Sequence, residues 1–422
     1  MRSWTSPELP RLPGNAAVPR IYDTPRRRLR ALQIDTEAQL YVCGITPYDA
    51  THLGHAATYL AYDTLGRVLR DAGLSVSYVQ NVTDVDDPLL ERATATGVAW
   101  RDLAESQIEL FRGDMEALRI IPPEHYVGVV ETVDAIGDAC ARLLDEGFAY
   151  WVDGAPGEPD AAPDLYFDIA AGERLTSWHL GQESALDRGT MLRLSAERGG
   201  DPERPGKRDP LDPLLWRSGR PGEPAWDSPV GRGRPGWHIE CSVIGSLHLT
   251  APITLNGGGS DLVFPHHEMS AAHSAALTGT DWSHCYSHAG MVAYDGEKMS
   301  KSLGNLVLVS NLVADGVDPQ AIRLALLAHH YRSDWEWTDD DLPTAEARLA
   351  RWRAWAESID HTVPTSDTAH ELLDALRNTL ADDLDTPSAL AAVDSAVTGP
   401  SSTHPVAIDA INALLGIDLL QE

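Results

Sequence analysis

The sequence predicts an α/β protein: a Rossmann-type parallel sheet, divided by an insertion and followed by a helical bundle. A short apolar segment over Ala38–Val42 is typical of a strand, and the periodic apolar run over Ala56–Val68 is typical of the helix after it. Ser75–Gln80 then has the pattern of a second strand. The order strand, helix, strand indicates a βαβ unit, which places its strands in parallel. Beyond Tyr331 the apolar pattern is helical.

These patterns divide the 422 residues into five segments. Residues 1–37 form an irregular lead-in, and residues 38–150 form the first half of the core. Residues 151–235 are rich in Gly, Pro and Asp and form the insertion, whereas residues 236–330 return to strand–loop–helix order as the second half. Residues 331–422 form the helical bundle. Further helices are expected at Ala104–Leu118, Val127–Glu146, Pro343–Ile359, Ala369–Asp382 and Pro387–Val397.

The composition indicates a globular cytoplasmic protein. Hydrophobic residues make up 43% of the chain, yet no apolar run approaches the roughly 20 residues that span a bilayer. The proline-containing stretch 1–20 lacks the apolar centre of a signal peptide, so we expect a cytoplasmic location and no membrane partner. Four cysteines in a chain of this length do not indicate a disulfide framework.

The net charge of −30 argues against a nucleic-acid partner. Proteins that hold tRNA use Lys and Arg to neutralise phosphates, and a uniformly acidic surface repels a polyanion at long range. The arginine-rich stretches 26–30 and 198–208 are interpreted as solvated loops.

The stretch from Thr46 to Tyr59 contains two histidines around a glycine, His52-Leu53-Gly54-His55, between the first strand and the first helix. This arrangement suits a nucleotide, because glycine lets the backbone approach, helix N-terminal amides favour phosphate, and imidazoles donate to phosphate oxygens. Two histidines at a turn, taken alone, are more often surface or packing residues.

A lysine pair near the other end strengthens the nucleotide interpretation. The chain has 33 basic residues, of which only Lys207, Lys298 and Lys301 are lysines. Two of the three therefore stand within the stretch Glu297–Asn305. Lysine is a mobile point charge on a flexible stem, which suits a loop that closes on a phosphate group. A solvated basic turn is the alternative, and the scarcity of lysine argues against it.

Together the two motifs resemble the paired signatures of class I aminoacyl-tRNA synthetases. Four more stretches narrow the resemblance to cysteinyl-tRNA synthetase and its relatives. These stretches are Tyr41–Gly44, Asn81–Asp87, Gly236–Ser242 and Gly257–Glu268. The resemblance extends from about Arg20 to about Ala392, and the residues after Ala392 are too few for an anticodon-binding domain. The expected fold is therefore a class I synthetase catalytic core.

Cys43, Cys241 and His266 lie in three separate segments, each beside a turn. Two thiolates and one imidazole suit tetrahedral Zn²⁺, and three protein ligands leave one position open, as in catalytic sites. A substrate thiol bound there as thiolate, at about 2.3 Å from the metal, would be selected over the serine hydroxyl. The alternative treats both cysteines as small buried hydrophobes.

The resemblance also implies roles in catalysis. Thr46, His52 and His55 would contact the phosphates of ATP, which binds with Mg²⁺, and Lys298 and Lys301 would close over pyrophosphate. Asp261 and His55 are the candidates for the base that takes the proton of the attacking amine. The residues assigned to the rest of the cysteinyl-adenylate pocket are Cys43, Gly44, Ile45, Thr58, Asn81, Val82, Thr83, Trp237, Gly259, Ser260, Asp261 and Val292.

Several positions depart from the synthetase pattern. The synthetases usually have a glutamate at Ser270, histidine at Asn256, arginine at Ala57 and lysine at Pro88. Each change lies near the substrate, whereas the nucleotide and metal residues are retained. This pattern indicates the same activation chemistry with a different acceptor.

One branch of the family, the cysteine ligases of mycothiol biosynthesis, lacks the anticodon domain and shares the hexapeptide Glu197–Pro202. This resemblance implies that the chain joins L-cysteine to the amine of glucosaminyl-inositol through cysteinyl-adenylate, releasing AMP and pyrophosphate. It also implies one zinc ion, a monomer and no tRNA. The hexapeptide is expected to help form the acceptor site.

Three alternatives stay open from the sequence. A short tRNA-charging synthetase fits the core motifs but not the acidic charge or Ser270. A non-catalytic cysteine-binding paralogue would not need two lysines in a closing loop. A zinc-stabilised structural protein leaves the nucleotide motifs unexplained. Release of pyrophosphate from ATP in the presence of cysteine separates the catalysts from the last two.

Overall fold

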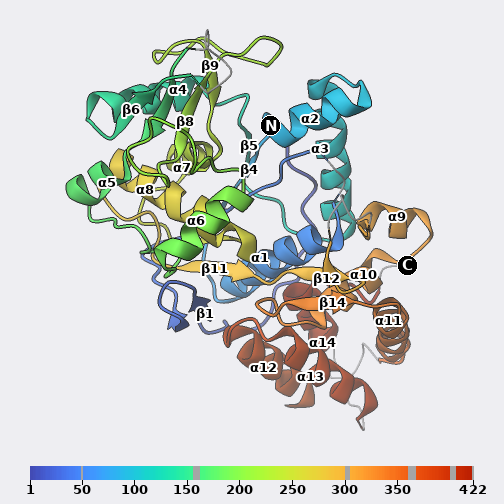
Figure 1. The fold of residues 1–422 in the computed structure, drawn as a ribbon. Helices are drawn as coiled ribbons and strands as arrows, with labels where there is room; N and C mark the ends of the chain where they lie inside the picture. Colours follow the sequence, from blue (N-terminus) through green and yellow to red (C-terminus); the bar gives the residue numbers. More distant parts are fainter. Residues whose placement is uncertain (49–50, 155–161, 300–304, 360–366, 400–404, 421–422) are drawn as a thin grey trace.

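A parallel sheet forms the centre of the protein, as seen in a computed structural model (Figure 1). The structure describes residues 1–48, 51–154, 162–299, 305–359, 367–399 and 405–420. The five strands of the sheet all run parallel, in the order β11-β10-β3-β4-β5. Their bounds are Ala38–Val42 (β3), Val76–Val82 (β4), His125–Gly128 (β5), Leu255–Gly259 (β10) and Tyr286–Ala289 (β11).

The two strands predicted for the βαβ unit are confirmed. Strand β3 has the predicted bounds, and β4 extends two residues beyond the predicted end, to Val82. Both are buried almost throughout, because helices cover the two faces of a parallel sheet and leave little of it to solvent. The first helix, α1 (Leu53–Asp71), connects them, and its stretch Tyr59–Leu69 is buried all round because α1 packs between the sheet and the C-terminal helices.

Helices fill the layers on either side of the sheet. Their bounds are Asp87–Thr96 (α2), Trp100–Ala117 (α3), Val133–Asp145 (α4), Trp237–His248 (α7), Glu268–Thr278 (α8), Val309–Ala314 (α9) and Pro319–Leu327 (α10). The predicted helix Val127–Glu146 is wrong over its first residues, since β5 ends at Gly128 and α4 begins only at Val133. Its apolar N-terminal residues are buried as a sheet strand and the turn after it.

The insertion is a four-stranded antiparallel sheet in the order β6-β7-β8-β9, with two helices. Glu268 at the start of α8 ties the insertion to the core, because its carboxylate accepts backbone N–H bonds from Gly181, Glu183 and Ser184, at 2.8 to 3.2 Å. The bounds are Ala149–Val152 (β6), Asp164–Phe167 (β7), Ile169–Leu175 (α5), Arg188–Glu197 (α6), Leu214–Ser218 (β8) and Gly233–Pro235 (β9).

The lead-in is more ordered than predicted. Residues 1–37 contain an antiparallel hairpin, β1 (Arg20–Asp23) and β2 (Arg28–Ala31), where an irregular segment is expected. The buried carboxylate of Asp23 accepts hydrogen bonds from Arg26 and Arg30, each at 2.8 Å. These arginines therefore fold onto their own hairpin and do not form a basic patch.

The C-terminal part is helical, as predicted, and gathers at one end of the molecule (Figure 1). A small sheet, β13-β12-β14, precedes it. Among the described residues, no helix is both long and apolar enough to cross a membrane. The remaining bounds are Val292–Tyr294 (β12), Glu297–Lys298 (β13), Trp335–Trp337 (β14), Asp341–Glu357 (α11), Asp367–Ala381 (α12), Thr386–Thr398 (α13), Pro405–Ala410 (α14) and Ile411–Leu415 (η3).

Candidate functional site

The predicted nucleotide turn lies at the carboxyl end of β3 and opens helix α1. His52 is the N-cap of α1, and its Nδ1 accepts hydrogen bonds from the backbone N–H groups of Gly54, at 3.1 Å, and His55, at 3.4 Å. The rings of His52 and His55 stack with 3.8 Å between their centroids. Ligands of open α/β sheets bind at the carboxyl ends of the strands, which is where these two imidazoles stand.

The end of β3 is held against β4 by a close backbone approach. A Cβ at Gly44 would lie 1.6 Å from the carbonyl oxygen of Asn81, so only glycine fits there. The Asn81 amide oxygen accepts from the backbone N–H of Gly44 at 2.8 Å, and Thr83 N–H donates to Ile45 O at 3.0 Å. Asn81 and Thr83 therefore shape the predicted pocket from behind, and with Val82 they do not line the cavity described below.

The three predicted metal ligands converge. The donor atoms of Cys43, Cys241 and His266 all lie within 4.8 Å of one another, and all three residues are buried. Cys43 stands directly after β3, and His266 is in the short helix η2 (Val263–His267), which follows η1 (Ser260–Leu262) and precedes α8. Cys241 lies within α7, so its predicted position beside a turn is wrong. This donor set has the soft and borderline atoms that zinc prefers, so the residues present fit the metal.

The protonation states around the cluster also suit a cation. Burial alone would raise the pKa of the Cys241 thiol, but contacts with Cys43 and His266 lower it well below its usual value. Burial and the neighbouring Cys241 raise the pKa of Cys43. Burial lowers the pKa of His267 well below its usual range, which keeps this imidazole neutral.

A second layer of imidazoles, absent from the predicted site residues, surrounds the ligands. Nε2 of His267 lies 3.2 Å from Cys43 Sγ, and its Nδ1 lies 2.8 Å from His288 Nε2. His288 Nδ1 is in turn 2.7 Å from the hydroxyl of Thr24. His238 Nδ1 lies 3.0 Å from His266 Nδ1. Of these three histidines, His267 could have been predicted from the sequence, because it directly follows the predicted ligand His266.

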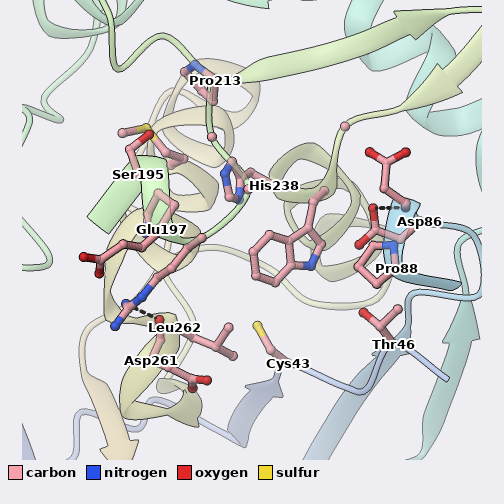
Figure 2. A pocket seen from close by; sticks show the side chains of 18 of the residues that line it. Cys43, Thr46, Asp86, Pro88, Ser195, Glu197, Pro213, His238, Asp261 and Leu262 are labelled. Atoms are coloured by element: carbon pink, nitrogen blue, oxygen red, sulfur yellow. Dashed lines mark hydrogen bonds between the residues drawn. The ribbon is translucent and has the colours of Figure 1, made fainter. Parts of the chain in front are cut away.

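Cys43 also lines a cavity of about 930 Å³, which connects the metal cluster with the nucleotide turn. Asp86, Pro88 and Thr46 lie on one side of it, Glu197 and Asp261 lie on the other, and Cys43 lies between them (Figure 2). The predicted site residues that line this cavity are Cys43, Gly44, Ile45, Thr46, His52, His55, Thr58, Trp237, Gly259, Asp261 and Val292.

The remaining predicted residues do not line the cavity or lie outside the described part. Cys241 and His266 stand behind Cys43, and Ser260 is in η1 beside the cavity. Lys298 ends β13, and its side chain is outside the described residues, as is the whole of Lys301. The roles of these residues therefore stay predictions.

The hexapeptide Glu197–Pro202 reaches the core through its arginine. Arg198 comes directly after α6, and its Nη1 donates to the carbonyl oxygens of Asp261 and Phe264, each at 2.5 Å. These two carbonyls bracket the turn that leads into His266. A Cβ at Gly200 would lie 2.8 Å from the carbonyl oxygen of Ser195, so glycine is required for the tight turn after Arg198.

Arg198→Met should weaken zinc binding by about tenfold to a hundredfold, the usual cost of losing a group that orients a metal ligand. The reason is that methionine cannot hold the two carbonyls next to His266. Chelator competition measures the zinc affinity directly. Arg193→Met is the matched control, since Arg193 lies on α6, five residues before Arg198, and pairs with Glu197 at the surface. An unchanged zinc affinity in Arg198→Met would show that these bonds do not position the ligand.

Solved structures share the fold. A methionyl-tRNA synthetase from Mycobacterium tuberculosis in complex with methionyl-adenylate superposes with a TM-score of 0.60, covering 86% of this chain and 82% of its own. A leucyl-tRNA synthetase from Agrobacterium radiobacter K84, in a ternary complex with tRNA, gives a TM-score of 0.60 over 90% and 83%. Their sequence identities are 17% and 13%, so this similarity concerns the fold alone.

Other proteins are far more similar to this chain in sequence than these solved structures are. A protein of Clavibacter michiganensis named L-cysteine:1D-myo-inositol 2-amino-2-deoxy-alpha-D-glucopyranoside ligase is 61% identical, covering 99% of both chains. A protein of Micrococcus luteus with the same name is 56% identical, covering 99% of this chain and 100% of its own. The family model of the class I (C) tRNA synthetase catalytic domain matches residues 31–347. The chain therefore belongs to the class I (C) tRNA synthetase catalytic-domain family and is a member of its cysteine ligase branch.

Proposed function

We propose that this protein joins L-cysteine to the amine of glucosaminyl-inositol in two steps, by way of cysteinyl-adenylate. The observation that carries the proposal is the meeting of two sites in one cavity. Cys43 brings the Cys43–Cys241–His266 cluster to the cavity wall, and the histidine turn lines the same space. A thiol-selecting centre and a phosphate-binding turn are what activation of cysteine by ATP requires.

In the first step the cysteine carboxylate attacks the α-phosphate of ATP, an oxygen–phosphorus bond forms, and pyrophosphate leaves. Such a transfer needs positioning and charge neutralisation. His52 and His55 stand at the N-terminus of α1, where the positive end of the helix dipole favours phosphate and the two imidazoles would donate to its oxygens. Lys298 and Lys301 would close over the leaving pyrophosphate, and Mg²⁺ would accompany the nucleotide.

The remaining assignments position the two substrates. Trp237 would line the pocket of the cysteinyl group, with Thr83 behind the pocket wall, and Val292, in β12, would contact adenine. Gly259 and Asp261 line the cavity near the expected ribose, with Ser260 between them. Each of these contacts rests on the family resemblance together with the position of the residue in or beside the cavity.

Cys43, Cys241 and His266 would hold the zinc ion. When bound, zinc would accept the substrate thiolate at its open position and so separate cysteine from serine. Cys43 is the one of the three that lines the cavity, so a metal held by these ligands would be within reach of a substrate thiol. The second-layer residues His267 and His238 keep the ligands oriented through their ring contacts.

In the second step the amine attacks the acyl carbon, the carbon–oxygen bond to AMP breaks, and an amide forms. The amine must lose a proton, for which Asp261 and His55 are the candidates. Asp261→Asn should slow the transfer step in a single turnover from pH 6 to 9 if the carboxylate takes this proton. A rate that matches the wild type across this range would remove Asp261 from that role.

The first step is tested by cysteine-dependent exchange of labelled pyrophosphate into ATP. We expect exchange with cysteine and none above background with serine, since zinc selects the thiolate. Equal exchange with both amino acids would contradict a thiol-selecting site, and no exchange with either would favour a binding paralogue. A monomeric state and a cytoplasmic location stay predictions.

A further inference from the structure

We propose that the part of the cavity between the insertion sheet and the start of α2 binds the hydroxyl-rich end of the acceptor, with Asp87 and Arg217 as its central contacts. The inference rests on the proposed function and adds to it the place and the means of acceptor recognition. The cavity extends beyond the nucleotide turn and the cysteine cluster to β7, β8, β9 and the first turn of α2. No role in nucleotide or cysteine binding is assigned to that extension.

One side of this extension is the face of β7. Arg204 pairs with Asp164 at 2.7 Å, and Lys207 pairs with Asp201 at 2.9 Å. Both cations lie 5.3 Å from the ring centre of Tyr166, whose hydroxyl donates to Asp201. All five side chains line the cavity. Tyr166 itself is only 1% exposed, so it supports this side from behind. The group presented to a ligand is the Asp201 carboxylate, which is 41% exposed and is held in place by Lys207 and the Tyr166 hydroxyl.

The other side is an ionic bridge between the insertion and α2. The Asp87 carboxylate accepts a hydrogen bond from Arg234 and lies 3.6 Å from Arg217. Glu223 joins the two arginines from behind, at 3.2 Å from Arg217 and 3.4 Å from Arg234. Asp87, Arg217 and Arg234 line the cavity, and the Asp87 and Arg217 side chains are 51% and 28% exposed. Both are thus reachable by a ligand.

The charges of this wall select the chemical class of the ligand. Each of the four cations named on the two sides is paired with a carboxylate, and Asp86, Glu91 and Asp212 also line the cavity, so this wall has no excess of positive charge. A polyphosphate chain requires an excess of Lys and Arg, which this wall lacks. A hydroxyl both donates and accepts, and alternating guanidinium and carboxylate groups held rigid by their own ion pairs satisfy both functions.

The orientation of the acceptor is set by the chemistry. Its amine must reach the acyl carbon, which the proposed site places near Cys43 and Trp237. The ring farthest from the amine then lies toward the Asp87–Arg217 bridge. Asp86 and Pro88 of the same turn face the cavity opposite Glu197, so the acceptor passes between them (Figure 2). The departure from lysine at Pro88 falls at this passage.

Arg217→Met and Asp87→Asn test the proposal. We expect each to raise the acceptor KM by about tenfold or more, because each removes a charge-assisted hydrogen bond to the acceptor. Cysteine-dependent pyrophosphate exchange should stay within about twofold of wild type, because a group outside the adenylate contacts leaves its transition state unchanged. Asp87→Asn keeps the size and polarity of the side chain, so it tests the idea even if Arg217→Met disturbs the insertion.

Arg232→Met is the matched control. Arg232 lies just before β9, two residues from Arg234, but is 65% exposed, pairs with the exposed Asp227, and does not line the cavity. Its acceptor KM should match that of the wild type. An acceptor KM within twofold of wild type in both test variants, or an equal loss of pyrophosphate exchange, would overturn the subsite. A wild-type enzyme that does not use glucosaminyl-inositol at all would instead overturn the proposed function.

Discussion

Cys241→Ser should abolish stoichiometric zinc binding and reduce cysteine-dependent pyrophosphate exchange by at least about a hundredfold. This loss is larger than the roughly tenfold to hundredfold loss expected when a residue that only orients a metal ligand is replaced. The neighbours of Cys241 favour its thiolate form, whereas a serine hydroxyl stays protonated and is a poor zinc ligand. Without zinc, the site has no group that binds the thiol of the substrate cysteine in preference to the hydroxyl of free serine. Metal analysis of the purified variant and the exchange assay measure the two effects.

Cys140→Ser provides the control for this substitution. Cys140 is equally buried, lies in α4 away from the cluster, and its Sγ donates to Leu215 O at 3.6 Å, a bond that a hydroxyl can also make. The control should bind one zinc ion and support exchange at the wild-type rate. If Cys241→Ser kept a full zinc complement with unchanged affinity, the Cys43–Cys241–His266 cluster would not be the metal site.

Asp63→Ala should be the most destabilising single change outside the cavity. Asp63 in α1 is fully buried and pairs with Arg67, at 2.8 Å, and with Arg323 of α10, both of which are also fully buried. Alanine would leave two guanidinium groups without a counter-charge inside the protein. Breaking a buried pair in this way costs about 3–5 kcal/mol, to be measured as the free energy of unfolding in urea.

The two arginines join distant parts of the chain, so the loss should be global. Arg67 donates to the carbonyl oxygens of Asn412 and Ala413 at 3.1 Å, and Arg323 donates to Leu118 O at 2.7 Å. Asp382→Ala is the control, because its partner Arg20 is exposed and such a surface pair contributes only about 0–1 kcal/mol. Equal destabilisation by both variants would show that the buried triad does not hold these segments together.

The same triad predicts a pH dependence. Burial raises the pKa of Asp63, but Arg67 and Arg323 outweigh it and hold the pKa below the usual value. A group with a depressed folded-state pKa stabilises the protein above its unfolded pKa, about 3.9 for Asp, and this contribution is lost as the pH falls further. Wild type should therefore lose more stability than Asp63→Ala between pH 5 and pH 2.5.

Local patterns in the sequence were sufficient to predict the central elements of the fold. The strand Ala38–Val42, the histidine turn and the helices near the C-terminus each carry a strong local signal, and the structure confirms them. Strand β5 was missed because its four residues run into the apolar residues before α4, which together mimic a helical period. The hairpin at Arg20–Ala31 was missed because one of its strands is largely exposed and polar.

The features that hold the site together depend on contacts between distant segments. Asp63 and Arg323 are separated by 260 residues, and Arg198 contacts Asp261 across 63 residues. No local pattern indicates either pair. The three metal ligands could be predicted only with the help of the family resemblance, because their spacing in the sequence is not that of a compact zinc motif. The hexapeptide is predicted to help form the acceptor site; Glu197–Asp201 line the cavity, and Arg198 in addition binds the core backbone.

The most direct test of the proposed ligase activity is the release of AMP from ATP and cysteine, measured with glucosaminyl-inositol or with cysteine tRNA as the acceptor. We expect acceleration by glucosaminyl-inositol and none by tRNA, together with a new amide product in the first case. Acceleration by tRNA alone would contradict the proposed activity and would make the chain a short tRNA-charging synthetase.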